Sequence, residues 1–167
     1  QLLRVSMELG GNAPFIVFDD ADLDDVVEGA MIAKMRNIGE ACTAANRFYV
    51  HESLADEFSA ALARRMGALT LGKGTKKGVD VGPLVDEKAR DKVSALVDDA
   101  VAKGAKVLVG GSAPKGAGWF YSPTVLADVP ADVTISCDSI RYEPSPTITY
   151  TSRSGAAILM PSPPAIS

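Results

Sequence analysis

The sequence contains little cysteine and almost no histidine. Its 167 residues include two cysteines, Cys42 and Cys137, one histidine, His51, and no C-x-x-C pair. Two cysteines are too few for the disulfide framework of a small secreted protein. A zinc site is also not expected, because such sites need clustered cysteine and histidine. The cysteine content indicates a reducing compartment, where a cysteine is free, metal-bound or catalytic.

An excess of positive charge and long apolar runs are also missing. The formal net charge is -4, the pI is near 5.0, and the acidic residues are scattered. No run approaches the ~20 apolar residues of a membrane-spanning helix, and residues 1–4 lack the pattern of a signal peptide. We therefore expect no nucleic-acid partner, no membrane partner and a cytoplasmic location.

The sequence does contain alternating short apolar runs and amphipathic segments, in a length typical of one domain. The run Asp19-Asp20-Ala21-Asp22 is suited to supply the N-cap and the first-turn acids of the first helix, Ser53 to cap the second, and Gly104 to end the third. Strands are predicted at residues 5–9, 15–18, 47–50 and 106–110, with one or two more short strands from residues 119–121 and 124–126, and helices at residues 23–35, 53–66 and 86–103. This alternation predicts an α/β fold with an open, largely parallel sheet flanked by helices.

The end of the chain has a different pattern. From about Ser136 the periodicity fades, and residues 143–146 and 161–164 carry prolines that do not fit a helix interior or a central strand. The sequence therefore predicts a domain over residues 1–135 and an irregular tail over residues 136–167.

Two residues are candidates for chemistry. Cys42 follows the end of the first helix, and the next residues could begin another helical turn whose N–H groups favour a thiolate. The alternative is that Cys42 is a small buried apolar residue. Glu8 lies at a predicted strand end beside Gly10, where burial would raise its pKa toward that of a general base. The alternative there is a solvated glutamate.

Four segments carry a resemblance to a known family. They are "MELGGNAP" (residues 7–14), "NIGEACTAANRFYVH" (37–51), "VGPLVDEKA" (81–89) and "GWFYSPTVLADV" (118–129). In order and content they resemble the aldehyde dehydrogenase family, including the 34 residues that separate Glu8 from Cys42. The likeness covers roughly residues 1–135. Within the family, residues 37–47 and "HESLADEF" are most similar to bacterial succinate-semialdehyde dehydrogenases.

The resemblance implies a mechanism. Cys42 would attack a small aldehyde to give a thiohemiacetal, hydride would pass to NAD or NADP, and Glu8 would activate water against the resulting thioester. The backbone N–H of Cys42 would stabilise the oxyanion, and the backbone carbonyl of Leu9 would contact the nicotinamide amide. A homo-oligomer is also implied, and apolar strands exposed on this chain alone would favour self-association.

The sequence departs from the family in three respects. The dinucleotide-binding half is expected to precede Gln1, Glu40 replaces a glutamine, and Ser139 stands where a ribose-binding glutamate is expected. Two alternatives therefore stay open beside the dehydrogenase. One is a folded module without turnover, and the other is a hydrolase using Cys42 and Glu8. The hydrolase is disfavoured because His51 is distant in sequence and is better explained as a surface or capping residue.

Overall fold

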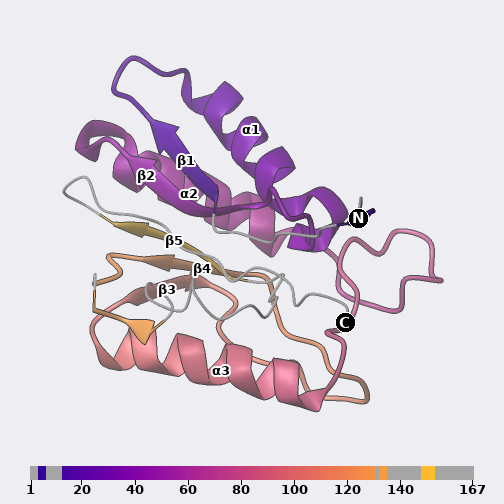
Figure 1. The fold of residues 1–167 in the computed structure, drawn as a ribbon. Coiled ribbons are helices and arrows are strands. Elements are labelled where there is room, and N and C mark those ends of the chain that lie inside the picture. The colour runs from indigo at the N-terminus through magenta and orange to yellow at the C-terminus, as the bar shows by residue number, and fades with distance from the viewer. Residues whose placement is uncertain (1–3, 7–12, 131, 135–147, 153–167) are drawn as a thin grey trace.

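The structure is a computed structural model, and it describes residues 4–6, 13–130, 132–134 and 148–152 (Figure 1). The strands are β1 (Ala13–Val17), β2 (Ala45–Val50), β3 (Lys106–Val109), β4 (Thr124–Ala127) and β5 (Ile148–Ser152). The helices are α1 (Leu23–Met35), α2 (Glu52–Gly67) and α3 (Glu87–Ala102), with a short 3-10 segment, η1 (Arg36–Gly39), directly after α1. None of the described helices is both long and apolar enough to cross a membrane.

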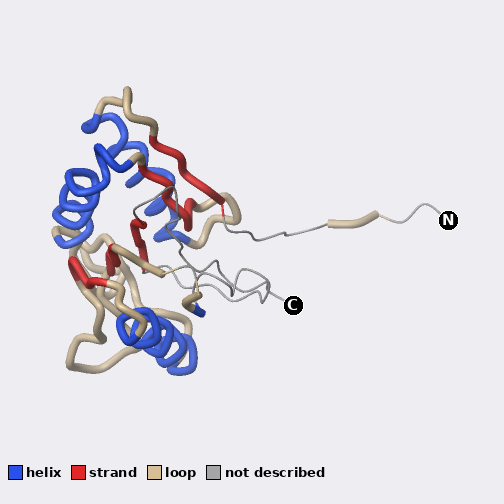
Figure 2. The backbone as a smooth tube through the Cα atoms, turned by 90° about the vertical axis from the view of Figure 1, so that its left-hand side faces the viewer, coloured by secondary structure: helices blue, strands red, loops and turns tan. Residues whose placement is uncertain are grey.

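The described strands, drawn in red in Figure 2, form one sheet in the order β1-β2-β5-β4-β3, and Figure 1 labels each of them. The pairs β1–β2, β2–β5 and β4–β5 are parallel, and only the edge strand β3 runs antiparallel to its neighbour β4. The predicted α/β fold with an open, largely parallel sheet is therefore confirmed.

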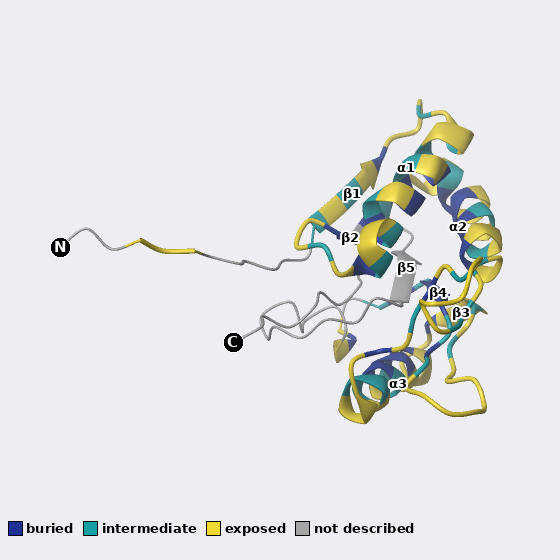
Figure 3. Ribbon diagram, turned by 90° about the vertical axis from the view of Figure 1, so that its right-hand side faces the viewer, coloured by how far each residue is buried: buried dark blue, intermediate teal, exposed yellow. Residues whose placement is uncertain are grey.

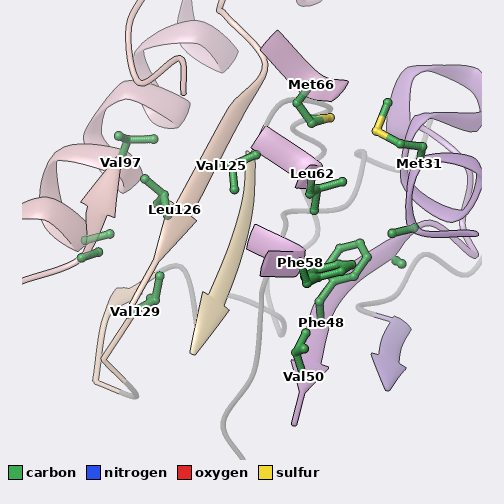
Figure 4. Packing of buried hydrophobic residues seen from close by; sticks show 14 of the residues in the cluster. Met31, Phe48, Val50, Phe58, Leu62, Met66, Val97, Val125, Leu126 and Val129 are labelled. Carbon is green, nitrogen blue, oxygen red and sulfur yellow. The ribbon is translucent and has the colours of Figure 1, made fainter. Parts of the chain in front are cut away.

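Helices cover both faces of the sheet around β4. All four residues of β4 are buried, as expected of a strand covered on two sides. Val125 points toward Leu62 of α2, whereas its neighbour Leu126 lies on the side of Val97 of α3 (Figure 4). This alternation follows from the two-residue period of a strand.

The α2 side of the core is built from aromatic and long apolar side chains. Phe48 and Phe58 are fully buried with their ring centroids 6.0 Å apart. The ring centroids of Phe15 and Phe48 are 5.2 Å apart. Tilted aromatic pairs at these distances are favourable beyond the area they bury. They join α2 to the first two strands.

Each α-helix has a side-chain cap at its N-terminus. The Asp22 carboxylate accepts from the N–H groups of Asp24 and Asp25 at 3.0 and 3.1 Å. Asp86 accepts from the N–H of Ala89 at 2.8 Å. The prediction that Ser53 caps α2 is wrong, because His51 is the cap and its Nδ1 accepts from the N–H of Ser53 at 3.3 Å. The prediction of a surface or capping role for His51 is confirmed.

Of the one or two short strands expected from residues 119–121 and 124–126, one forms: residues 124–126 lie in β4, and residues 119–121 are not in a strand. The Trp119 carbonyl accepts from the N–H of Leu84 at 2.8 Å, and the Trp119 ring lies under the Arg90 guanidinium, 5.1 Å from its centroid. These contacts hold the segment against the start of α3 rather than beside a strand. The strand predicted at residues 5–9 lies largely outside the described residues, and the described Val5 is not in a strand and is exposed.

The largest correction concerns the predicted irregular tail. Five of its residues form β5, which occupies the middle of the sheet and pairs with β2 on one side and β4 on the other. The segment Ile148–Ser152 reads ITYTS, and β-branched and aromatic residues favour strands. Pro144 and Pro146 precede the strand and the remaining prolines of the tail, at 161, 163 and 164, follow it, so no proline interrupts it. The division into a domain over residues 1–135 and a tail is otherwise untested and stays a prediction.

Candidate functional site

Cys42 lies in the short turn between η1 and β2, and its side chain is exposed. The N–H of Ala44 donates to the carbonyl of Ala41 at 2.8 Å and closes this turn around the cysteine. Ala44 and Ala45 are buried, so the chain enters the core two residues after the thiol. The alternative reading of Cys42 as a buried apolar residue is therefore wrong.

The predicted helical turn after Cys42 is also wrong. Residues 41–43 form bends and turns, and β2 begins at Ala45, so no helix N-terminus lies at the thiol. A run of small residues is compatible with either a helix or an extended chain. Here Ala45 pairs with Ala13 of β1, and this pairing makes the chain after the turn a strand. Thr43 and Glu40 are both exposed, so the Glu40 carboxylate is directed to solvent.

Glu8 and Leu9 lie outside the described residues. Their roles and their meeting with Cys42 remain predictions. β1 and β2 are parallel neighbours with Ala13 opposite Ala45, so the two strands begin at the same end of the sheet. Glu8 precedes β1 and Cys42 precedes β2, each by a few residues.

The helix N-termini of the described residues do not fit the phosphates of a dinucleotide. A pyrophosphate needs free backbone N–H groups at a glycine-rich strand-to-helix turn. The turn between β1 and α1 instead carries Asp19, Asp20 and Asp22, and the Asp22 carboxylate already accepts two of the helix N–H groups. The other two α-helices are capped by His51 and Asp86. Among the described residues, no group of three or more His, Cys, Asp or Glu side chains could hold a metal ion.

Lys34 is an unusual residue that the sequence reasoning did not single out. It lies in the last turn of α1, only 1% exposed, and burial lowers its pKa to about 7. Removing an ammonium from water disfavours its charged form. The helical spacing could have found it, because Lys34 shares a face with the buried Val27, Ala30 and Met31.

A groove of about 650 Å³ lies between α2, the edge strand β3 and the end of its neighbour β4. Its walls include Ala60 and Ala63 of α2, Leu108 of β3 and the ion pair between Lys106 and Asp128, 2.7 Å apart. Cys42 does not line it. The thiol therefore lies outside this groove, on the turn that leads into β2.

Comparison with known proteins decides the family. The sequence profile described as the aldehyde dehydrogenase family matches residues 1–141. The chain belongs to the aldehyde dehydrogenase family. The resemblance that the four sequence segments carry is thereby confirmed.

The chain is similar to several succinate-semialdehyde dehydrogenases. It is 56% identical over 155 residues to that of Paenarthrobacter nicotinovorans, covering 93% of this chain and 34% of the relative. It is 52% identical over 133 residues to succinate-semialdehyde dehydrogenase [NADP(+)] GabD of Escherichia coli (strain K12), covering 80% of this chain and 28% of the relative. The solved structure of succinate-semialdehyde dehydrogenase from Burkholderia pseudomallei matches with a TM-score of 0.78 at 43% identity, over 90% of this chain and 30% of that one.

This aldehyde dehydrogenase chain thus spans about a third or less of the relatives it matches. The match to the Paenarthrobacter nicotinovorans relative covers 155 of the 167 residues. It therefore continues beyond residue 135, where the sequence resemblance was expected to stop. This range includes β5.

Proposed function

We propose that this chain is the nucleophile-bearing part of an NAD(P)-dependent aldehyde dehydrogenase that oxidises succinate semialdehyde. The observation that carries the proposal is the parallel pairing of β1 and β2, which begin at the same end of the sheet with Ala13 opposite Ala45. Glu8 precedes β1 in the sequence and Cys42 precedes β2, and in this proposal the two residues meet at that end. Membership of the family and high identity to enzymes named for succinate semialdehyde support the reaction and its substrate.

Cys42 acts as the nucleophile. Its exposed thiol, as thiolate, adds to the aldehyde carbon, forming a C–S bond while the carbonyl π electrons move to oxygen. The Cys42 backbone N–H stabilises that oxyanion. The tetrahedral thiohemiacetal can then lose hydride, which a planar carbonyl cannot do, and a thioester on Cys42 remains.

Glu8 acts in the second half of the reaction. Its carboxylate takes a proton from water as the water oxygen attacks the thioester carbon. The C–S bond breaks, the carboxylic acid leaves, and the thiolate of Cys42 is regenerated. Thiolate is a good leaving group, so one sulfur serves both halves.

The hydride acceptor, NAD or NADP, would be held mainly by residues other than the described ones. The capped, acidic helix N-termini supply no phosphate-binding turn there. In this proposal the contribution of the present chain is the backbone carbonyl of Leu9, which contacts the nicotinamide amide.

A soluble homo-oligomer in the cytoplasm is part of the same proposal. Among the described strands, β1 lies at an edge of the sheet and is largely exposed (Figure 3). Ile16 of β1 is 58% exposed, and Phe18, the residue that follows the strand, is 65% exposed. Apolar side chains on an unpaired edge favour association with further protein surface.

A chimera tests the function directly. The chain replaces the matched 155 residues of its Paenarthrobacter nicotinovorans relative, and reduction of NAD and NADP is followed with succinate semialdehyde and with glutarate semialdehyde. We expect turnover that Cys42→Ser abolishes. Glu8→Gln should leave one equivalent of reduced cofactor per active site followed by arrest, because the thioester forms but is not hydrolysed.

The alternative is a folded module without turnover. It is favoured by the absence of a phosphate-binding turn among the described residues. A chimera that is folded by near-UV circular dichroism but reduces no cofactor would support the module. Hydrolysis of an activated ester by this chain alone, lost in Cys42→Ser, would instead support a hydrolase.

A further inference from the structure

A left-handed turn lies immediately before the nucleophile. Asn37 has φ 50° and ψ 43°, Ile38 has φ 51° and ψ 24°, and Gly39 has φ 87°. Glycine adopts positive φ freely and asparagine tolerates it. Ile38 is different, because a β-branched residue in this region is a genuine outlier.

Such a backbone persists only where the surrounding structure holds it. The N–H of Arg36 donates to the carbonyl of Ile32 at the end of α1, and the N–H of Glu40 donates to the carbonyl of Asn37 at 3.0 Å. The turn is therefore fixed to the helix on one side and closed on itself on the other. Gly39 within it is buried.

The turn also decides how the chain approaches Cys42. After the thiol, the path is constrained by the buried Ala44 and by the pairing of Ala45 with Ala13. Before the thiol, the nearest α-helix along the chain is α1, and the left-handed turn sets the angle between α1 and the Cys42 turn. A right-handed conformation at Ile38 would redirect the chain four residues before the sulfur.

We propose that Ile38 is a positioning residue for Cys42 and that it acts through its left-handed backbone rather than through its side chain. This inference rests on the proposed function, in which the Cys42 thiol attacks the aldehyde. The left-handed backbone at Ile38 aims the thiol, and a thiol displaced by about 1 Å would cost about 100-fold in rate.

Two pairs of variants separate the backbone from the side chain. Ile38→Gly and Ile38→Ala both remove the side chain beyond Cβ, but only glycine accepts positive φ without strain. In this chain we expect Ile38→Gly to have a higher urea midpoint than Ile38→Ala. The second pair, Ile38→Asn and Ile38→Val, should show the same order, with asparagine more stable, if the glycine variant does not fold.

The matched control is Ile32, an exposed isoleucine in α1 with ordinary helical surroundings. There the order should be inverted, with Ile32→Ala more stable than Ile32→Gly, because glycine is the poorer residue in a helix interior. If alanine were more stable than glycine at both positions 32 and 38, the left-handed assignment of Ile38 would be overturned.

Kinetics in the chimera test the positioning itself. We expect Ile38→Gly and Ile38→Asn to keep kcat within about twofold, and Ile38→Ala to lower kcat about tenfold or more with an unchanged KM. Equal kcat values in all of these variants would overturn the inference and leave the proposed function intact. A folded wild-type chimera without turnover would overturn both.

Discussion

The hydroxyl of Thr124 links the first residue of β4 to the turn after β3. Oγ1 of Thr124 accepts from the N–H of Gly111 at 2.8 Å and donates to the carbonyl of Ser122 at 2.7 Å, and the side chain is completely buried. One hydroxyl therefore satisfies two backbone groups that belong to opposite ends of the connection between β3 and β4.

Replacing Thr124 with valine should destabilise the chain by about 1–3 kcal/mol, because it leaves the Gly111 N–H and the Ser122 carbonyl without this partner. Urea unfolding measures the effect. Thr124→Ser keeps the hydroxyl and loses only a methyl group, so it should cost less. A serine variant that is less stable than the valine variant would contradict the role of the hydrogen bonds.

Gly110 should not tolerate a side chain. Its φ is +74°, and a Cβ placed on it would come to 2.2 Å from the Pro123 carbonyl oxygen, which is backbone and cannot move aside cheaply. Gly110→Ala should cost about 2 kcal/mol or more, from the strained conformation and the contact together. Gly74→Ala is the control, because that glycine has open space around it, and its urea midpoint should remain close to that of the wild type.

The comparison of sequence and structure shows which features local patterns encode. The ends of α1 and a cap within residues 19–22 follow from neighbours within a few residues, and the sequence predicts them; the structure assigns the cap to Asp22. The position of β5 depends on its pairing with strands more than 20 residues away along the chain. The prolines near β5 give no information about that pairing. The irregular turn at Cys42 likewise depends on the pairing of Ala45 with Ala13. The family segments identified Cys42 without showing its surroundings.

The central place of β5 makes a prediction about truncation. β5 is the only described strand that pairs with both β2 and β4, so it joins the two halves of the sheet. A chain that ends at Pro146 should lose cooperative urea unfolding and much of its near-UV circular dichroism. A chain that ends at Ser152 should retain both. Equal cooperativity in the two truncated chains would show that the β1–β2 and β3–β4 pairs are stable without β5.

Lys34 makes stability depend on pH. Its pKa is about 7 in the folded chain and near 10.5 when unfolded, so between these values the unfolded state binds more protons. Stability from this group must therefore rise as pH increases from about 7 to 10. Lys34→Met should flatten the rise in unfolding free energy between pH 7 and 9.5 by about 1–3 kcal/mol, since each pKa unit corresponds to about 1.4 kcal/mol.

The control for Lys34 is Lys88→Met, which removes an exposed lysine from α3 and keeps the same change in net charge. Urea midpoints of the wild type and both variants at the two pH values separate the effect of burial from that of charge. We expect the Lys88 variant to keep the rise with pH and the Lys34 variant to lose it. Parallel pH profiles for the two variants would mean that the Lys34 ammonium remains charged inside the fold, stabilised by its surroundings as well as it is by water.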